Sequence, residues 1–183
     1  MPVNKVFVSE KTVKDGVHLF PGQNLYNGSK PLENIFGELN SLEIDLLNVA
    51  SGIFAADLAI QRDERELYIR DIEITIDVVN LSSFEQIVDL LENALLTVSK
   101  DNWTVNFVQK DGIPVTNFKW SESEGAALLF SGGLDSMCAA SDFVRDNKNL
   151  VLVSHNSHGN KVVDDSQNNV HSLLEEYYSK KIK

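Results

Sequence analysis

The sequence has almost none of the residues that build disulfides or zinc sites, because its 183 residues include a single cysteine, Cys138. One cysteine excludes an intramolecular disulfide and any multi-cysteine zinc site made by this chain, so zinc is not expected. No apolar run approaches the roughly 20 residues of a membrane span, and Met1–Lys5 lacks the apolar stretch of a signal peptide. These absences predict a protein of the reducing cytoplasm that does not contact a membrane.

Basic residues are also scarce: the chain has 16 Lys and Arg but 27 Asp and Glu, which gives a net charge of −11. Proteins that bind DNA or RNA need a basic surface, so direct nucleic-acid binding is not expected. The charge is uneven, with about −10 in residues 1–126 and about −1 in residues 127–183. The last third can therefore accept a small phosphate ligand, while the acidity of the first two thirds favours solubility.

The first two thirds of the chain predict an α+β domain over residues 1–110. Helices are expected where apolar residues recur at helical spacing, over residues 38–60 and 82–98, with Ser41 capping the first. Strands are expected at short apolar or alternating runs, namely 3–8, 17–20, 72–78 and 102–109. Residues 111–125 are polar and contain Pro114, so we interpret them as a linker between two domains.

The last third predicts a different organisation, over residues 126–183. Ala126–Phe130 is wholly apolar, which is typical of a strand buried on both faces of a parallel sheet. A helix over residues 136–146, a second apolar strand at Leu150–Ser154 and a helix over residues 167–179 follow. This β-α-β-α order is the start of a doubly wound parallel sheet, so the fold class expected for the chain is α/β.

The most informative residues follow the first of these strands and read Ser131-Gly132-Gly133-Leu134-Asp135-Ser136. They open a helix, whose N-terminus offers free N–H groups and a partial positive charge. The two glycines allow positive φ and a close approach of the backbone to an anion. The two serine hydroxyls can donate to phosphate oxygens, and the aspartate can hold the Mg²⁺ that accompanies a phosphate. The segment therefore predicts a phosphate-binding nest, with a simple capped turn as the alternative.

The chain contains no Gly-x-x-x-x-Gly-Lys-Ser/Thr loop of the Walker type. The pattern Ser-Gly-Gly-x-Asp-Ser instead resembles that of the N-type ATP pyrophosphatases, called the PP-loop family. The resemblance implies a domain of the adenine nucleotide alpha hydrolase-like fold. It also implies cleavage of ATP between its α and β phosphates, adenylation of a carboxylate or carbonyl oxygen, and displacement of AMP by a nitrogen or sulfur nucleophile. The implied partners are thus ATP, Mg²⁺ and a small-molecule carboxylate or carbonyl acceptor.

The resemblance also implies roles for individual residues. The ATP phosphates would be bound by Ser131, Gly132, Gly133, Leu134, Asp135 and Ser136. Asp135 would hold the metal and is the one residue expected to be catalytic. In this fold the end of the next strand lies against the adenosine, which here places Ser154 and His155 at the nucleotide.

Three segments before this motif occur in an order similar to that of the 7-cyano-7-deazaguanine synthase-like proteins of Qat-type anti-phage operons. The segments are Phe54–Arg62, Tyr68–Ile74 and Asp101–Phe107. The resemblance implies a carbon–nitrogen ligase related to the queuosine-pathway enzyme that converts a carboxylated deazapurine to a nitrile with ATP and ammonia. Other branches of the family carry one of two glutaminase modules. One needs a nucleophilic cysteine at the N-terminus, and this chain begins Met1-Pro2. The other needs a cysteine in a glutaminase domain, and the single cysteine of this chain, Cys138, follows the motif, so neither module is expected.

Two departures from this family are visible. The cysteine cluster that binds zinc in the queuosine-pathway enzymes is missing, and the sequence ends at Lys183 after two strand–helix units. We therefore expect an N-terminal fragment, whose sheet is completed by a missing C-terminal segment or by a partner chain. Two other functions stay open. One is an asparagine synthetase-like or other PP-loop amidotransferase, including tRNA-modifying enzymes, which the acidic charge disfavours. The other is a non-catalytic nucleotide-binding scaffold subunit.

Two features of the last third resemble reactive sites. His155 and His158 have a spacing that can ligate a metal, but no third ligand is near in the sequence, so we interpret them as part of a polar loop. Cys138 follows a helix N-terminus that could activate a thiol, but it has no neighbouring base, and a buried packing role is expected.

Two charged groups receive structural interpretations as well. Asp57, Arg62 and Arg70 are expected to form interdomain or surface ion pairs. The adjacent Asp164 and Asp165 are expected to be a pair in a solvated loop or at the start of a helix.

Overall fold

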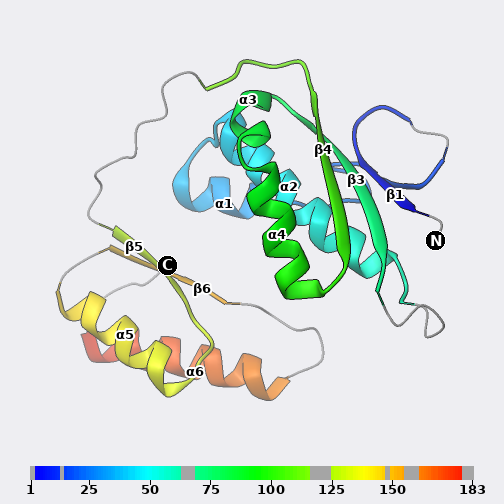
Figure 1. Cartoon of the computed structure of the whole chain (residues 1–183). Coiled ribbons are helices and arrows are strands. Elements are labelled where there is room, and N and C mark those ends of the chain that lie inside the picture. Colours follow the sequence, from blue (N-terminus) through cyan, green and yellow to red (C-terminus); the bar gives the residue numbers. More distant parts are fainter. Residues whose placement is uncertain are drawn as a thin grey trace. The chain divides into compact units, whose positions relative to one another are not determined.

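The computed structural model describes residues 3–12, 15–62, 69–115, 125–146, 149–154 and 161–178 (Figure 1). The chain divides into two compact units, Met1–Phe118 and Lys119–Lys183. Within the described residues, no helix has both the length and the apolar character that a membrane crossing requires. His155 and His158 lie outside the described residues.

The first unit contains a four-stranded sheet in the order β2-β1-β3-β4, in which every pairing is parallel. Its strands are β1 (Asn4–Val8), β2 (Val17–Leu19), β3 (Asp71–Val78) and β4 (Asn102–Gln109). Parallel strands need crossover connections, and helices supply them between β2, β3 and β4. The α/β class is thus confirmed, but the α+β organisation expected for residues 1–110 is wrong. Alternation along a strand predicts which residues face the core and carries no information on strand direction.

The helices of this unit are α1 (Ser29–Phe36), α2 (Ser41–Ala59), α3 (Leu81–Glu85) and α4 (Val88–Ser99). The helix predicted over residues 82–98 is thus divided into α3 and α4. Asn40, in place of Ser41, caps α2: its side-chain oxygen accepts from the N–H groups of Leu42 and Glu43 at 3.0 Å each. The Glu43 carboxylate in turn accepts from the Asn40 N–H at 2.8 Å, which completes a capping box.

The core of the first unit lies on one face of its sheet. β3 alternates strictly, with Ile72, Ile74, Ile76 and Val78 buried and the residues between them half-buried. α2 packs against β1, β2 and β3, and α4 packs against β4. The side chains that these helices cover are aliphatic or aromatic, whereas the opposite face carries polar residues such as Glu73 and Thr104.

A close approach of α2 to β1 depends on Gly52. A Cβ added at this position would lie 2.6 Å from Cγ2 of Val8, a rigid side chain that is almost completely buried. We expect Gly52→Ala to lower the free energy of unfolding by about 1–2 kcal/mol, because overpacking outweighs the gain of about 1 kcal/mol in helix propensity. Urea denaturation would measure this change. In a Val8→Ala background the same substitution should be neutral or stabilising, and an equal cost in both backgrounds would contradict the packing explanation.

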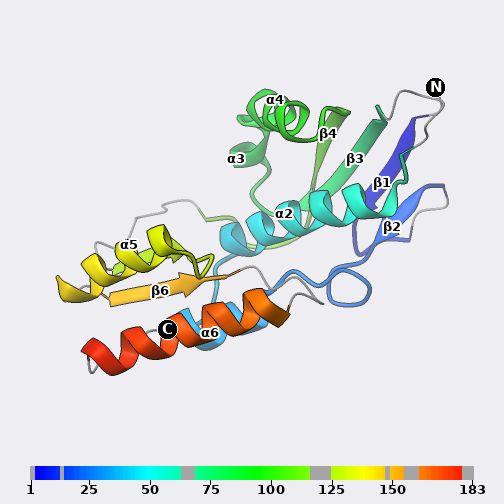
Figure 2. The same cartoon turned by 90° about the horizontal axis from the view of Figure 1, so that it is seen from below.

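The second unit has the order β5 (Gly125–Leu129), α5 (Leu134–Arg145), β6 (Asn149–Val153) and α6 (Lys161–Tyr178). β5 pairs with β6 in parallel, with Ala126 opposite Leu150 and Leu128 opposite Leu152. Both helices pack on the same face of this pair, which the two views of Figures 1 and 2 show together. They share one core there, whose buried members are Phe130, Ala140, Val144, Leu150 and Leu174.

The other face of the β5–β6 pair is open. Leu129 and Val153 lie opposite each other on this face and are 80% and 46% exposed. The expectation that the first strand is buried on both faces is therefore wrong, because α5 and α6 cover only one face. A second helical layer, which a doubly wound sheet requires, does not occur among the described residues of this unit.

Candidate functional site

The two glycines of the Ser131–Ser136 segment have different backbone conformations. Gly132 has φ +78°, in the left-handed region that favours glycine. Gly133 has φ −86° and ψ 171°, an extended conformation that any residue adopts, and it is the N-cap of α5. Of the two glycines expected to provide positive φ, only Gly132 therefore does so.

The two serines of the segment lie close together. The hydroxyl oxygens of Ser131 and Ser136 lie 3.3 Å apart. Ser136 Oγ donates to the carbonyl oxygen of Gly133 at 2.9 Å, and Ser131 Oγ accepts from the N–H of Gly133 at 3.3 Å. Both hydroxyls thus lie over the first turn of α5, where the N–H groups have no partner within the helix.

Asp135 and Leu134 lie in the first turn of α5 with exposed side chains. Because its side chain is exposed, the Asp135 carboxylate is available to a cation. The Leu134 side chain is 72% exposed, and only its backbone N–H can contribute to an anion site.

Of the two residues expected at the adenosine, Ser154 is described and His155 lies outside the described residues. Ser154 Oγ donates to the carbonyl oxygen of Phe130 at 2.9 Å. This hydrogen bond joins the end of β6 to the residue just before the Ser131–Ser136 segment. Ser154 is therefore adjacent to the segment, and its hydroxyl proton is already used by the protein.

The N-terminal part of α6 holds the segment from one side, a contact that sequence reasoning missed. Ser166 Oγ donates to the carbonyl oxygen of Gly132 at 3.3 Å, and Gln167 Nε2 donates to that of Ser131 at 3.5 Å. A Cβ at Gly132 would lie 2.9 Å from Gln167 Cγ and 3.1 Å from both its Cα and its N. No signal in the sequence could have found this contact, because it joins residues more than 30 positions apart.

The orientation of the Ser131–Gly132 peptide follows from this contact. In a trans peptide the C=O and N–H groups point in opposite directions. Because the carbonyl oxygen of Ser131 faces α6, the N–H of Gly132 points away from that helix. The contact with α6 thus directs a backbone donor of the segment away from that helix.

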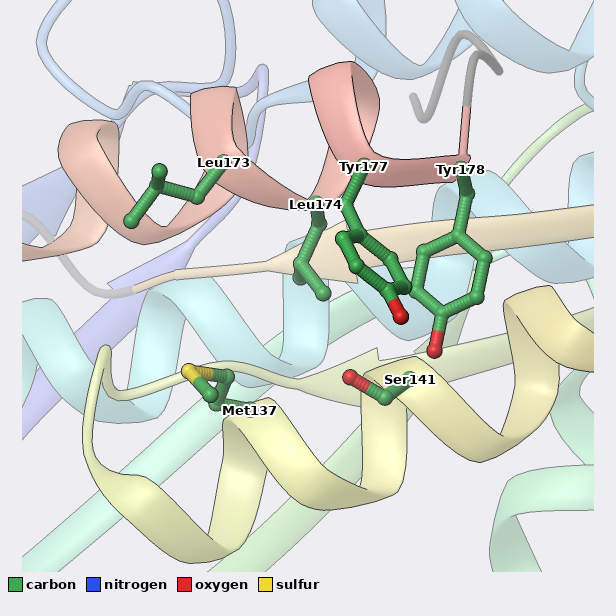
Figure 3. Close-up of a pocket in the computed structure, with 6 residues that line it drawn as sticks. All are labelled: Met137, Ser141, Leu173, Leu174, Tyr177 and Tyr178. Carbon is green, nitrogen blue, oxygen red and sulfur yellow. The ribbon is translucent and has the colours of Figure 1, made fainter.

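An open groove of about 400 Å³ lies between α5 and α6, beginning one residue after Ser136 (Figure 3). Its lining consists of Met137, Ser141, Leu173, Leu174, Tyr177 and Tyr178. The rings of the two tyrosines meet edge to face with centroids 4.9 Å apart.

Cys138 lies on α5 and is exposed, so the buried packing role expected for it is wrong.

The charged cluster of the first unit is built around a buried ion pair between Arg70 and Asp101. Arg70 is 5% exposed and Asp101 is fully buried. The Arg70 guanidinium contacts both the Asp101 and the Asp57 carboxylates, and Arg62 makes a second ion pair with Asp101 at 2.8 Å. All four residues belong to the first unit. The expected ion pairs are confirmed, and Arg62 and Asp57 make theirs from the surface, with side chains 37% and 41% exposed. The burial of Arg70 was not expected, and all four residues lie in one unit, so the interdomain alternative is wrong.

The residues near the segment fit a magnesium ion bound together with a phosphate. Within the described parts of the chain, no group of three His, Cys, Asp or Glu could hold a metal alone. Mg²⁺ is usually bound by one or two carboxylates, with phosphate oxygens and water completing its six ligands. Asp135 supplies one such carboxylate. On α6, Oδ1 of Asp164 is buried and lacks a hydrogen-bond partner, while Asp165 is exposed. The expected place near the start of a helix is thus confirmed for both residues, and the expected solvation for Asp165, whereas Asp164 is half-buried.

Comparisons of the chain with protein-family models, with curated proteins and with solved structures gave no match. The function is therefore inferred from the Ser131–Ser136 segment and its surroundings.

Proposed function

We propose that the Ser131–Ser136 segment binds the β and γ phosphates of ATP with Mg²⁺, and that the protein uses ATP to adenylate a carboxylate or carbonyl oxygen. The observation that carries this proposal is that three kinds of anion donor occur within one short segment. They are the N–H of Gly132, which points away from α6, the hydroxyls of Ser131 and Ser136, 3.3 Å apart, and the N-terminus of α5. To donate to a phosphate, the Ser136 hydroxyl has to turn away from the carbonyl oxygen of Gly133. Asp135 adds a carboxylate for the metal at the same helix turn.

In this proposal the chain acts by positioning and by charge stabilisation. The backbone N–H groups and both serine hydroxyls bind the phosphate oxygens and stay with the pyrophosphate as it leaves. Bound Mg²⁺ would supply a positive charge that stabilises the negative charge developing on the leaving group. Asp135 would hold this ion, and the contacts of Ser166 and Gln167 would keep the segment in its anion-binding conformation.

The finer assignment rests on the resemblance to 7-cyano-7-deazaguanine synthase-like proteins. We propose that the acceptor is the carboxylate of a deazapurine or related nucleobase, and that the protein works in the cytoplasm in antiviral defence. We also propose a doubly wound arrangement for the second unit. The open face with Leu129 and Val153 would then receive the second layer, from further residues of the protein or from a partner chain.

The same open face favours one alternative function, a nucleotide-binding subunit that does no chemistry by itself. Exposed apolar side chains on a parallel strand pair indicate that this unit lacks a covering element. Such a subunit would bind ATP through the Ser131–Ser136 segment without cleaving it.

Exchange of labelled pyrophosphate into ATP, in the presence of heteroaromatic carboxylic acids, tests the proposed function. Reversible adenylation returns label to ATP only if the bond between the α and β phosphates is cleaved. We expect exchange with wild-type protein, AMP and no ADP as the nucleotide product, and loss of exchange in Asp135→Asn. ADP with orthophosphate, or full exchange in Asp135→Asn, would contradict the proposal. Tight ATP binding without exchange would favour the nucleotide-binding subunit.

A further inference from the structure

The outer edge of β4 has no strand paired with it among the described residues, because β4 ends the sheet order β2-β1-β3-β4. The strand is 8 residues long and contains no charged residue, proline or glycine. Unpaired edges recruit strands of other molecules, and native proteins usually prevent this with short strands, charges or prolines. The sequence of β4 supplies none of these protections.

The backbone groups that this edge presents follow from the pairing of β4 with β3. The N–H of Asn102 donates to the carbonyl oxygen of Arg70 at 2.9 Å, and that of Lys110 donates to the carbonyl oxygen of Val78 at 2.8 Å. The N–H and C=O groups of successive residues in a strand point to alternate sides, so those of the odd-numbered residues point away from β3. These outward residues are Trp103, Val105, Phe107 and Gln109.

Glu92 on α4 occupies one of the outward groups. Its Oε1 accepts from the N–H of Val105 at 2.8 Å, near the middle of the strand. α4 packs against β4 (Figure 1), and the Glu92 side chain is half-buried. A strand that paired with this edge would need the same N–H for its own ladder of hydrogen bonds. The Glu92 carboxylate and a pairing strand therefore compete for one donor.

A second copy of β4 fits this edge when the two strands run antiparallel about a two-fold axis at Asn106. In this register every outward residue lies opposite another one: Val105 faces Phe107 of the second copy, and Trp103 faces its Gln109. A pair of aromatic and β-branched side chains is favourable across strands. The strand carries no charge, so two acidic first units would meet there without like charges opposite each other.

We propose that Glu92 closes the edge of β4 and thereby keeps a second copy of the chain from pairing with it. This proposal does not depend on the proposed function, because all its residues lie in the first unit. Pairing of two wild-type chains through β4 would break two Glu92 contacts, one in each copy. A variant without the carboxylate has no such contact to break, so its edge is open.

Sedimentation velocity of the whole protein over a range of concentrations tests this proposal, with Glu92→Ala and Glu92→Gln as the matched pair. Both variants remove one negative charge per chain. Glutamine keeps the length of the side chain and an oxygen that can accept from the Val105 N–H, so Glu92→Gln should behave as wild type. Glu92→Ala should dimerise at concentrations about 10- to 100-fold lower, the effect of two hydrogen bonds that pairing no longer breaks.

A second substitution shows whether the dimer uses β4. Asn106 is exposed and lies on the proposed two-fold axis, so a lysine there would place two positive charges opposite each other. We expect Glu92→Ala/Asn106→Lys to return to the association of wild type. Hydrogen exchange should show protection of the Trp103 and Phe107 N–H groups in the Glu92→Ala dimer and no such protection in the double variant.

Association of Glu92→Ala equal to that of Glu92→Gln would overturn the proposal. A Glu92→Ala dimer that Asn106→Lys does not weaken would overturn it too, as would a wild-type dimer in which the Trp103 and Phe107 N–H groups are protected. If Glu92→Ala does not fold, Glu92→Asp keeps the charge and shortens the side chain by one methylene. It should also dimerise more readily than wild type, and equal association would contradict the role of Glu92.

Discussion

Replacing Asp101 by alanine is expected to lower the free energy of unfolding of the first unit by about 3–5 kcal/mol, the cost of leaving a buried charge without its partner. Asp101 is fully buried and accepts from the backbone N–H of Arg70 at 3.0 Å and from its Nη2 at 2.6 Å. It also accepts two hydrogen bonds from the guanidinium of Arg62, at 2.9 and 2.8 Å. Without the carboxylate, the guanidinium and the N–H of Arg70 lose their main acceptor inside the protein.

Asp57→Ala is the matched control for this prediction. The Asp57 carboxylate also contacts Arg70, but its side chain is 41% exposed, so water can replace it. We expect its removal to cost about 1 kcal/mol or less. Urea denaturation followed by the fluorescence of Trp103, which is buried in the same unit, measures both variants. A cost for Asp101→Ala as small as that for Asp57→Ala would show that the buried cluster does not stabilise the fold.

The same cluster predicts how stability changes with pH. Burial by itself would raise the pKa of Asp101, but the hydrogen bonds and charge of Arg70, with the charge of Arg62, bring it below its ordinary value of 3.8. A carboxylate with a lowered pKa contributes stability that is fully present above its unfolded-state pKa. This contribution should therefore be lost as the pH falls from about 3.8 through the lower folded-state pKa. In Asp101→Asn the free energy of unfolding should therefore decrease less between about pH 4 and lower pH than in wild type. An equal decrease in both proteins would show that Asp101 is not the source of this pH dependence.

Replacing Gly132 by valine is expected to abolish diphosphate binding and to destabilise the second unit by about 2–5 kcal/mol. A left-handed φ of +78° is strained for any residue with a Cβ, and most of all for a β-branched one. The added Cβ would also lie 3.1 Å from backbone atoms of Gln167, so α6 would have to move. Hydrogen exchange of the amides of β5 and α5 would measure the loss of stability.

Gly133→Val separates binding from folding. Gly133 has an extended backbone, and a Cβ there would meet only Ser131 Oγ, at 3.4 Å. We expect this variant to keep wild-type hydrogen exchange and to lose diphosphate binding, because the new side chain would occupy the approach to the segment. Full binding in Gly133→Val would show that a phosphate does not approach this peptide. Wild-type exchange in Gly132→Val would show that the left-handed conformation is not required.

The sequence predicted the elements of the fold better than their arrangement. Alternating apolar and polar residues located β3, and apolar residues at helical spacing located α2. Both patterns are visible because an element that is buried on one face has apolar residues at a regular spacing. The direction of the strands leaves no such period, so the parallel sheet of the first unit was missed. The open face at Leu129 was also missed, since an apolar run looks the same whether or not a second layer covers it.

The candidate site was predictable only where its residues are consecutive. The Ser131–Ser136 motif identified the serines that meet and the helix that begins there. Ser166 and Gln167 reach the segment only through the packing of α6, which no local pattern encodes. The partners of Arg70 were hidden for the same reason, because Asp101 is 31 positions away in the chain.

The central claim is that the N–H groups of the Ser131–Ser136 segment bind a diphosphate with a divalent cation. The most direct measurement is a titration of ¹⁵N-labelled protein with magnesium pyrophosphate, followed by amide resonances. The account predicts saturable shifts that are largest for Gly132, Gly133 and the first turn of α5, with little change in the first unit. Absence of shifts in this segment, or shifts centred elsewhere in the chain, would contradict it.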